Sequence, residues 1–437
     1  MRILLFSLAF CTAFLANATV YYISPSGNDG NNGTSSSTAW KTIDRLNQVT
    51  YSIVAGDQIL FKRDGTYRGI VSVAAYGTAA APVTVGAYGT GAAPVISGSM
   101  LVSGWSQYNG NIWRANIGAG QNVQYLYMNG QLMTLARYPN TGWLRNDQGT
   151  NTSLHDDALT QPSGYWTGSI LVVRATNWNY DRATISGFSQ GTLSFPTIYD
   201  VLGSNNWGYF LCNKLSELDQ PGEWYYDQSS GMLYFQAPGN INPSTVTVEA
   251  SVRDMGLEVS WHRSNVIISG LAFQHQSNAC IHVQDADHVT VDGCTFSDAY
   301  RGIVSVGHAN SYTNSTFTRT YGTALFALDD SSDIMDNEFT DVGMVPGLGE
   351  SSWGYFGIRT SGTGLVVSGN RLENIGYTGI EVDHNTLVEK NVLINATALL
   401  NDGGGIAFDF ANGLVIQDNI IRDCTGNLES SASSSVN

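Results

Sequence analysis

Four carboxylates and one arginine near the C-terminal end have the residue types and the spacing that chemistry needs. The tetrapeptides IRTS, IEVD and IAFD begin at residues 358, 380 and 406. Alternate residues of a strand share one face, so we expect one row with Arg359 next to Glu381 and another with Asp383 next to Asp409. Asp402 precedes the third tetrapeptide in a glycine-rich run, where a ligand can approach the backbone closely.

The expected distance between two of these carboxylates limits what they can do. Neighbouring strands lie about 4.7–4.9 Å apart. Asp383 and Asp409 could therefore share a proton, hold a cation, or act as the acid and nucleophile of a retaining glycosidase, whose carboxyl groups are about 5–5.5 Å apart. Each carboxylate taken alone is also typical of a turn cap or of a hydrogen-bonded ladder. No cofactor is required by this set, and Ca²⁺ is possible.

Other residues of the same region could bind substrate. Arg359 could hold a substrate carboxylate or hydroxyl, or could merely pair with Glu381. His384 could exchange a proton near neutral pH, or could be a turn residue. Glu350 and Trp353 could form a sugar subsite, or could belong to a surface loop with no role. We therefore predict catalytic roles for Asp402, Asp383, Glu381 and Asp409. We predict substrate binding for Arg359, His384, Trp353 and Glu350. We expect no resident metal.

A repeat in the second half of the chain predicts the elements that would position these residues. Short phrases that begin with Gly or Asn end at Phe273, Phe296, Phe317, Phe339, Leu372, Leu393 and Ile421. A second series runs in step and ends at Ile281, Ile303, Leu325, Ile358, Ile380 and Ile406. Two strand phrases about every 22 residues are typical of a right-handed parallel β-helix, in which each coil buries its apolar row against the next.

Two breaks in the repeat indicate where a site would lie. The interval from Phe339 to Leu372 is 33 residues, and the interval from Leu393 to Ile421 is 28 residues. We assign the extra residues to loops at 342–355 and 397–404. Insertions in such repeats form loops that are often on the binding face.

The rest of the chain is predicted to be all-β. We expect a signal peptide at 1–18, an N-terminal cap with first coils at 19–98, an inserted β-sandwich at 99–250, further coils at 251–426, and a Ser-rich tail at 427–437. A short amphipathic helix at Trp40–Val49 would cap the first coil. The tail has no capping pattern, which suggests a truncated chain or a piece of a longer protein.

Composition narrows the class of partner. The net charge is −16, which argues against nucleic acid and against an anionic membrane. The N-terminal pattern predicts export to the extracellular space or the periplasm, and the apolar run is too short for a membrane span. We expect a monomer that binds a polysaccharide or oligosaccharide. Cys280 and Cys294 could form a disulfide or could be buried thiols.

Several runs resemble known secreted bacterial proteins. YYISPSGNDGNNGTSSSTAWKTIDRLN from residue 21 and GDQILFKRDGTYRG from residue 56 resemble the opening of pectin-lyase-like β-helix proteins. LYMNGQLMTLARYPNTGWL from residue 126 and GEWYYDQSSGMLYFQAP from residue 222 resemble the inserted β-sandwich of family-120 and family-141 glycoside hydrolases. The resemblance implies hydrolysis by two carboxylates on neighbouring coils. DGGGI, residues 402–406, is similar to an Asp-x-Gly-x-Ile phrase of that group and implies a catalytic Asp402; Ala407 stands where an aromatic residue commonly follows.

Three functions remain open at this stage. A glycoside hydrolase that acts on a plant or algal polysaccharide comes first. A polysaccharide lyase comes second. Such an enzyme needs a Lys or Arg base, and the coils after Gly256 contain few basic residues besides Lys390, which disfavours it. A non-catalytic glycan-binding module comes third, since a fold does not determine a function.

Overall fold

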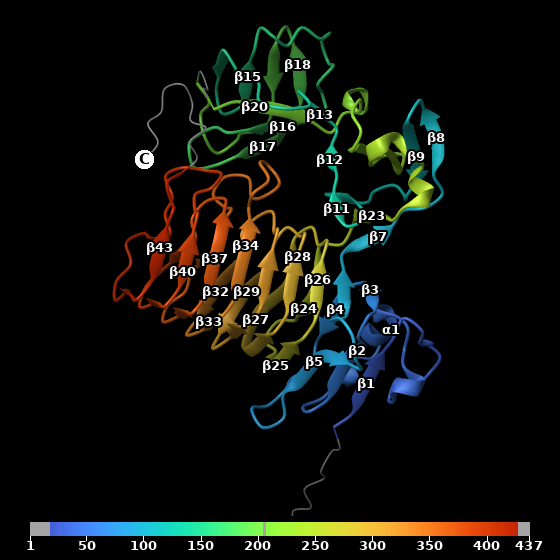
Figure 1. Cartoon of the computed structure of the whole chain (residues 1–437), viewed down its shortest axis with the longest axis vertical. Coiled ribbons are helices and arrows are strands. Elements are labelled where there is room, and N and C mark those ends of the chain that lie inside the picture. The colour runs from blue at the N-terminus through green and yellow to red at the C-terminus, as the bar shows by residue number, and fades with distance from the viewer. Residues whose placement is uncertain (1–17, 204–206, 427–437) are drawn as a thin grey trace, which may run out of the picture.

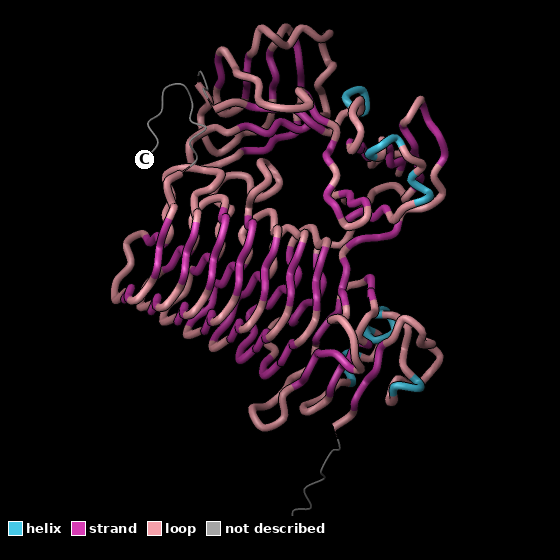
Figure 2. The backbone as a smooth tube through the Cα atoms, viewed as in Figure 1, coloured by secondary structure: helices cyan, strands magenta, loops and turns pink. Residues whose placement is uncertain are grey.

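The computed structural model describes residues 18–203 and 207–426, and the main body of these residues is a parallel β-helix (Figure 1). The expected signal peptide and Ser-rich tail lie outside the described residues, apart from Ala18. Two long sheets of 17 and 9 strands contain the coils. Register pairs divide the strands into three parallel rows, one on each side of the coil, and Figure 2 shows the short turns between them.

The first row contains the strands that carry the candidate residues. Its members follow one another along the β-helix: β4 (Val71–Val73), β24 (Met255–Val259), β27 (Ala279–Asp292), β29 (Ile303–His308), β32 (Leu325–Asp330), β35 (Ile358–Thr360), β38 (Ile380–Val382) and β41 (Ile406–Phe408). The predicted alignment of Ile281, Ile303, Leu325, Ile358, Ile380 and Ile406 is confirmed, because these residues are register partners in turn.

The second and third rows complete each coil. The second row consists of β1 (Val20–Ile23), β2 (Gln58–Lys62), β5 (Val83–Tyr88), β25 (Ser264–Ser269), the end of β27, β30 (Ser311–Thr313), β33 (Asp333–Met335), β36 (Val366–Ser368), β39 (Leu387–Glu389) and β42 (Val415–Gln417). The third row consists of β3 (Thr66–Arg68), β6 (Val95–Ser97), β26 (Ala272–Gln274), β28 (Thr295–Ser297), β31 (Thr316–Thr318), β34 (Glu338–Val342), β37 (Arg371–Ile375), β40 (Val392–Ile394) and β43 (Ile420–Arg422).

The two residue types of the repeated phrase have separate structural roles. The aromatic residues stack inside the β-helix, with ring centroids 4.6 Å apart for Phe296 and Phe317 and 4.5 Å for Phe317 and Phe339. The asparagines form a ladder between coils. The Asn337 amide N–H donates to Asn370 Oδ1 at 3.0 Å, and the Asn370 N–H donates to Asn391 Oδ1 at 2.9 Å. Buried backbone donors that a tight turn leaves unpaired are satisfied in this way.

The N-terminal cap contains the predicted helix in shorter form. Helix α1 spans Ile43–Asn47, and its N-cap Thr42 accepts the Arg45 N–H through its side chain. Ile43 and Leu46 are buried in the core of the first coils, together with Trp40. The helix therefore covers the open end of the coil stack, as the amphipathic pattern indicates.

Residues between β6 and β24 leave the coils and form small, largely antiparallel sheets. One two-sheet unit has its own apolar core and contains β13 (Arg137–Tyr138), β16 (Ile170–Val173), β17 (Asp181–Thr184) and β20 (Tyr209–Cys212), with β14 (Gln148–Gly149), β15 (Ser153–His155), β18 (Gly187–Ser189) and β19 (Thr192–Ser194). A second unit contains β7 (Ser99–Leu101), β10 (Leu126–Met128), β11 (Gln131–Leu132) and β23 (Val248–Ser251), with β8 (Ser106–Asn109), β9 (Ile112–Asn116), β12 (Thr134–Leu135), β21 (Glu223–Asp227) and β22 (Met232–Phe235). We call these residues, 99–251, the inserted domain.

The inserted domain folds back onto the loops that precede the first row. Val172, Tyr180 and Phe210 of the inserted domain share an apolar cluster with Tyr355 and Leu400 of the coils. The Ser352 N–H donates to the Tyr180 carbonyl at 3.0 Å, and the Asn401 N–H donates to the Asn177 carbonyl at 2.7 Å. Both loops at the breaks in the repeat thus hold the inserted domain, which lies above the coils in Figure 1.

The cysteines of the described chain are free thiols. Cys280 and Cys294 are buried at 0% and 1% exposure, and burial raises the pKa of each thiol. Of the two alternatives left open by the sequence, the structure has the buried thiols. None of the described helices is both long enough and apolar enough to cross a membrane.

Candidate active site

Outward-facing side chains of the first row form a line along the β-helix, and Glu381 lies near its C-terminal end. The residues on either side of each one in sequence point into the core, because a strand alternates its faces. Register partners connect the line in the order Glu258, His282, Val304, Phe326, Arg359, Glu381 and Ala407. The predicted neighbours Arg359 and Glu381 are therefore confirmed.

Glu381 is a largely buried carboxyl group with an incomplete set of partners. Its side chain is 12% exposed, and Oε2 lies 3.2 Å from the Nε of Arg359. Neither of these two atoms makes a hydrogen bond of acceptable geometry, so the contact is electrostatic. Burial is the largest cause that raises the pKa of Glu381, Arg359 opposes it, and Asp383 and Asp409 add to it; the pKa is about 7. A carboxyl group of this kind can hold a proton at neutral pH.

Aromatic rings fix the position of Arg359. Its guanidinium carbon lies 4.3 Å from the ring centroid of Trp353, 5.0 Å from Phe326 and 5.3 Å from Phe356. Cation–π contacts of this length are attractive and restrict where the guanidinium can lie. Trp353 comes from the loop after β34 and is 42% exposed, so part of its side chain is open to a ligand.

The other predicted carboxylates are more accessible. Asp383 follows β38, and its side chain is 36% exposed. Asp409 follows β41 and is exposed. Val382 and Phe408 are register partners, so Asp383 and Asp409 come next on adjacent strands, as the sequence predicts. Their charges reach Glu381, since both raise its pKa.

His384 is oriented by its neighbours. Its Nδ1 accepts the Asn412 N–H at 2.9 Å, so the proton of a neutral ring is on Nε2. Nε2 lies 3.3 Å from Oδ1 of Asp383. The imidazole thus orients the Asp383 carboxylate, and both side chains are partly open to solvent.

Asp402 lies at the exposed end of the loop before β41, and a tyrosine connects it to Glu381. Its φ of 65° is left-handed, and its carbonyl accepts the Tyr377 hydroxyl at 2.8 Å. Burial raises the pKa of Tyr377 to about 12, a hydrogen bond with Trp353 opposes the rise, and the charges of Asp402 and Glu381 contribute to it. Asp402 and Glu381 therefore lie near the same phenol.

Glu350 does not lie where a sugar could reach it, contrary to the expectation from the sequence. It is 8% exposed, and its Oε1 lies 2.9 Å from the Nε of Arg301. The Thr323 and Tyr355 N–H groups donate to its two oxygens. Burial acts to raise the pKa of Glu350, but Arg301 and these donors outweigh it and hold the pKa below its usual value. Glu350 anchors the loop that carries Trp353.

Sequence reasoning missed Phe326, Phe356 and Tyr377 as parts of this site. Phe326 occupies the position of Arg359 one coil earlier. Phe356 lies two residues before β35, and Tyr377 lies three residues before β38. Their ring centroids are 5.4 Å apart. Nothing in the spacing of the repeat distinguishes these rings from core residues, and the inserted domain that approaches them has no repeat of its own.

A possible metal site lies elsewhere. Among the described residues, one group of three His, Cys, Asp or Glu side chains brings its ligand atoms within 4.8 Å of one another, and it consists of Asp147, His155 and Asp157. This group is in the inserted domain. The Ca²⁺ considered for the carboxylates of the coils stays a prediction.

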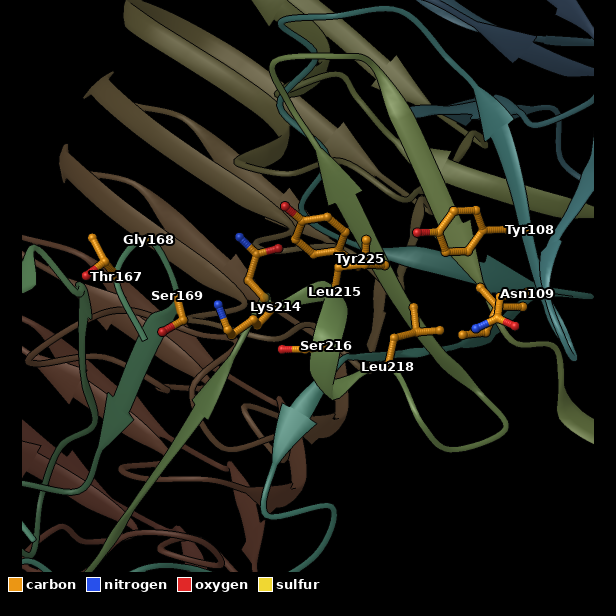
Figure 3. Close-up of a pocket in the computed structure, with 12 residues that line it drawn as sticks. Tyr108, Asn109, Thr167, Gly168, Ser169, Lys214, Leu215, Ser216, Leu218 and Tyr225 are labelled. Atoms are coloured by element: carbon orange, nitrogen blue, oxygen red, sulfur yellow. The ribbon is translucent and has the colours of Figure 1, made fainter. Parts of the chain in front are cut away.

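Several cavities surround the inserted domain. One of about 620 Å³ lies between its two units, where the rings of Tyr108 and Tyr225 are on either side of Leu215 (Figure 3). Another, of about 460 Å³, lies between the inserted domain and the loops that precede the first row. It borders the same loops that carry Trp353.

Comparison with known proteins supports the fold. Residues 255–398 match a family model described as a right-handed β-helix region. A solved structure described as a glycoside hydrolase has a TM-score of 0.64 and 14% identity, over 92% of this chain and 96% of that one. The structure of XylC in complex with xylose has a TM-score of 0.57 and 14% identity, over 89% and 68%. No curated protein matches the sequence. The chain is thus a right-handed parallel β-helix protein that shares its architecture with these two structures.

Proposed function

We propose that this protein is a glycoside hydrolase in which Glu381 is the general acid. The observation that carries the proposal is a carboxyl group with a pKa of about 7 on a solvent-facing row, beside two exposed carboxylates. A glycosidase needs one carboxyl group that is protonated near neutral pH and one that is ionised. Glu381 fits the first role, and Asp383 or Asp409 fits the second.

The surroundings of the carboxyl groups support a sugar as the substrate. Trp353 offers a partly exposed ring on which a sugar ring can stack. Arg359 can donate to a hydroxyl group through guanidinium nitrogens other than Nε, while the aromatic rings hold it in place. Two solved structures of similar architecture, one of them a glycoside hydrolase and the other a complex with xylose, agree with this class of ligand.

A polysaccharide lyase is the alternative, and Arg359 makes it less favourable. β-Elimination needs a base that takes up a proton from the sugar. Arg359 lies beside Glu381 and is stacked on three rings, so its guanidinium is already engaged in positioning contacts. A carboxyl-based hydrolysis leaves Arg359 in that role.

The decisive experiment measures product type on a panel of neutral and uronic polysaccharides and oligosaccharides. Hydrolysis yields new reducing ends without an ultraviolet-absorbing unsaturated product, whereas β-elimination yields that product. Glu381→Gln should abolish the release of reducing ends. Glu258→Gln, which changes the same residue type in the same outward row, should not. Binding without turnover in every case would favour the glycan-binding module.

We also propose that the protein is exported and acts as a monomer. The proposal rests on the apolar run at Ile3–Leu15 followed by Ala16-Asn17-Ala18, a pattern typical of a cleaved signal. N-terminal sequencing of the protein recovered from the producing cells should begin at Thr19. Sedimentation of that protein should give the mass of a single chain.

A further inference from the structure

A polar cavity lies on the same line of loops as the candidate active site. It has a volume of about 460 Å³ and is bounded by the inserted domain on one side and by the coils on the other. Its lining includes Asn122, Gln124, Arg182, Asn278, Tyr300 and Ser351. Asn278 directly precedes β27 and Tyr300 lies three residues before β29, so they belong to the row of loops that also includes the loops of Trp353 and Asp402.

The lining of this cavity has the chemistry of a sugar site with one positive charge. Amide groups come from Asn122, Gln124 and Asn278, and hydroxyl groups come from both sides of the cavity. None of the lining residues is acidic. Amides and hydroxyls pair with sugar hydroxyls in either direction, and Arg182 is the cationic group among them.

Arg182 is held in place but lacks an anionic partner. It lies on β17, and its backbone N–H donates to the Ser351 Oγ at 3.0 Å, which attaches the strand to the loop of Trp353. Its side chain is partly buried and forms no ion pair with any residue that the structure describes. Its charge reaches the phenols of Tyr125 and Tyr300, where it opposes the rise in pKa that burial causes. A guanidinium withdrawn from water without a carboxylate is a ready partner for an anionic ligand.

The distance from this cavity to Glu381 corresponds to several sugar units. The strands follow in the order β29, β32, β35 and β38, so three inter-strand steps separate the coil of Tyr300 from that of Glu381. At 4.7–4.9 Å per step this is about 14 Å. The two places differ in charge, because Asp383 and Asp409 act on Glu381 whereas the Arg182 cavity has no carboxylate in its lining.

We propose that Arg182 binds the anionic group of an acidic sugar residue, a uronate or a sulfated sugar, several units away from the bond that is cleaved at Glu381. The carboxylates near Glu381 repel such a residue, and Arg182 attracts it, so the charge orients the oligosaccharide along the coils. The statement about the cleaved bond rests on the proposed function, whereas the binding at Arg182 does not.

The test is calorimetric titration of the full chain with short defined oligosaccharides. The ligands are xylotriose as the neutral reference, the same backbone with a glucuronate branch, trigalacturonate, and a sulfated disaccharide. The proteins are the wild type, Arg182→Gln, Arg182→Lys and Glu381→Gln, with Arg114→Gln as a charge-matched control on another sheet of the inserted domain. At least one acidic ligand should bind the wild type more tightly than xylotriose does, and the response to glucuronate, galacturonate or sulfate identifies the anion.

The variants separate a specific site from general charge effects. Arg182→Gln should weaken binding of the acidic ligand about tenfold or more, as expected for a lost charge-assisted contact, and should leave xylotriose binding unchanged. Arg182→Lys should recover part of the affinity, and Arg114→Gln should match the wild type. Equal affinity for acidic and neutral ligands, or an unchanged affinity in Arg182→Gln, would overturn the proposal. Glu381→Gln should still bind; if turnover survives in that variant, the proposed catalytic role fails and the Arg182 site stands.

Discussion

Nε of Arg359 lies 3.2 Å from Oε2 of Glu381, yet no hydrogen bond of acceptable geometry joins them. The attraction is enough to oppose the effect of burial on Glu381 but leaves the pKa of that carboxyl at about 7. A well-aligned pair would have kept Glu381 ionised. The three rings around Arg359 hold its guanidinium where it lies, and so they help to keep the pKa of the neighbouring carboxyl group high.

Replacement of Glu381 by Gln should reduce kcat about 100-fold or more, because loss of general acid catalysis typically costs 10²–10⁴-fold. Oligosaccharide hydrolysis measured by reducing-end release tests this. Asp383→Asn and Asp409→Asn, measured in parallel, identify which carboxylate is the nucleophile or base. An active Glu381→Gln enzyme would remove Glu381 from the mechanism.

The pH dependence of kcat/KM should reflect the Glu381–Arg359 contact. A general acid must be protonated, so activity should fall as the pH rises through about 7. Arg359 opposes the rise in the pKa of Glu381, so Arg359→Met should move this alkaline limb to higher pH. Arg371→Met is the matched control, because Arg371 pairs with Glu373 on a different row. If the alkaline limb of the Arg359→Met profile lies at the same pH as in the wild type, the assignment of that limb to Glu381 is contradicted.

Stability should depend on pH through the same carboxyl group. The pKa of Glu381 in the folded protein, about 7, is above its ordinary value of 4.5. The contribution of the Glu381 carboxyl group to the free energy of unfolding is therefore fully present below about pH 4.5 and is lost as the pH rises through 7. The loss is on the order of 3 kcal/mol at most. Glu381→Gln should have the higher Tm of the two proteins at pH 9 and a similar Tm at pH 4. Thermal unfolding monitored by circular dichroism measures this, and a Tm difference that does not change with pH would refute it.

Trp353→Ala should raise KM more than it lowers kcat. The indole is 42% exposed, so its removal takes away a stacking surface for the sugar and loosens Arg359. We expect an increase in KM of about tenfold, equivalent to 1.4 kcal/mol. Trp261→Ala, which removes a 63% exposed indole from another turn, is the control and should leave the kinetics unchanged.

The asparagine ladder should be a major source of stability. Asn370→Ala leaves the Asn337 N–H and the Ile334 carbonyl without their partners inside the coils. We expect the free energy of unfolding to fall by about 2–4 kcal/mol, since each buried unsatisfied group costs about 1–3 kcal/mol. Urea unfolding measures the loss. Asn385→Ala is the control, because Asn385 lies at an exposed turn, and it should change the free energy of unfolding by much less.

The coils were predictable because each one repeats the same physical requirement. Every register partnership expected between the residues of the second series, from Ile281 to Ile406, is present, and the same pattern places Arg359 next to Glu381. What the sequence could not indicate is which side chains the loops turn inwards. Glu350 looks like a polar loop residue, but Arg301, 49 positions earlier, makes it a buried anchor. Tyr377 resembles a core residue, but its hydroxyl reaches the loop of Asp402.

The position of the inserted domain also explains how the β-helix can accommodate it. Val95 of β6 and Ala272 of β26 are register partners, although the whole inserted domain lies between them in sequence. Ser99 and Ser251 pair at the two ends of that domain, so the folded insertion joins the coils almost as a tight hairpin would. The entropy of closing a long loop grows only slowly with its length, and folding of the domain reduces it further. The inserted domain is therefore a module that can be exchanged for another while the coils keep their register and the carboxyl groups keep their places.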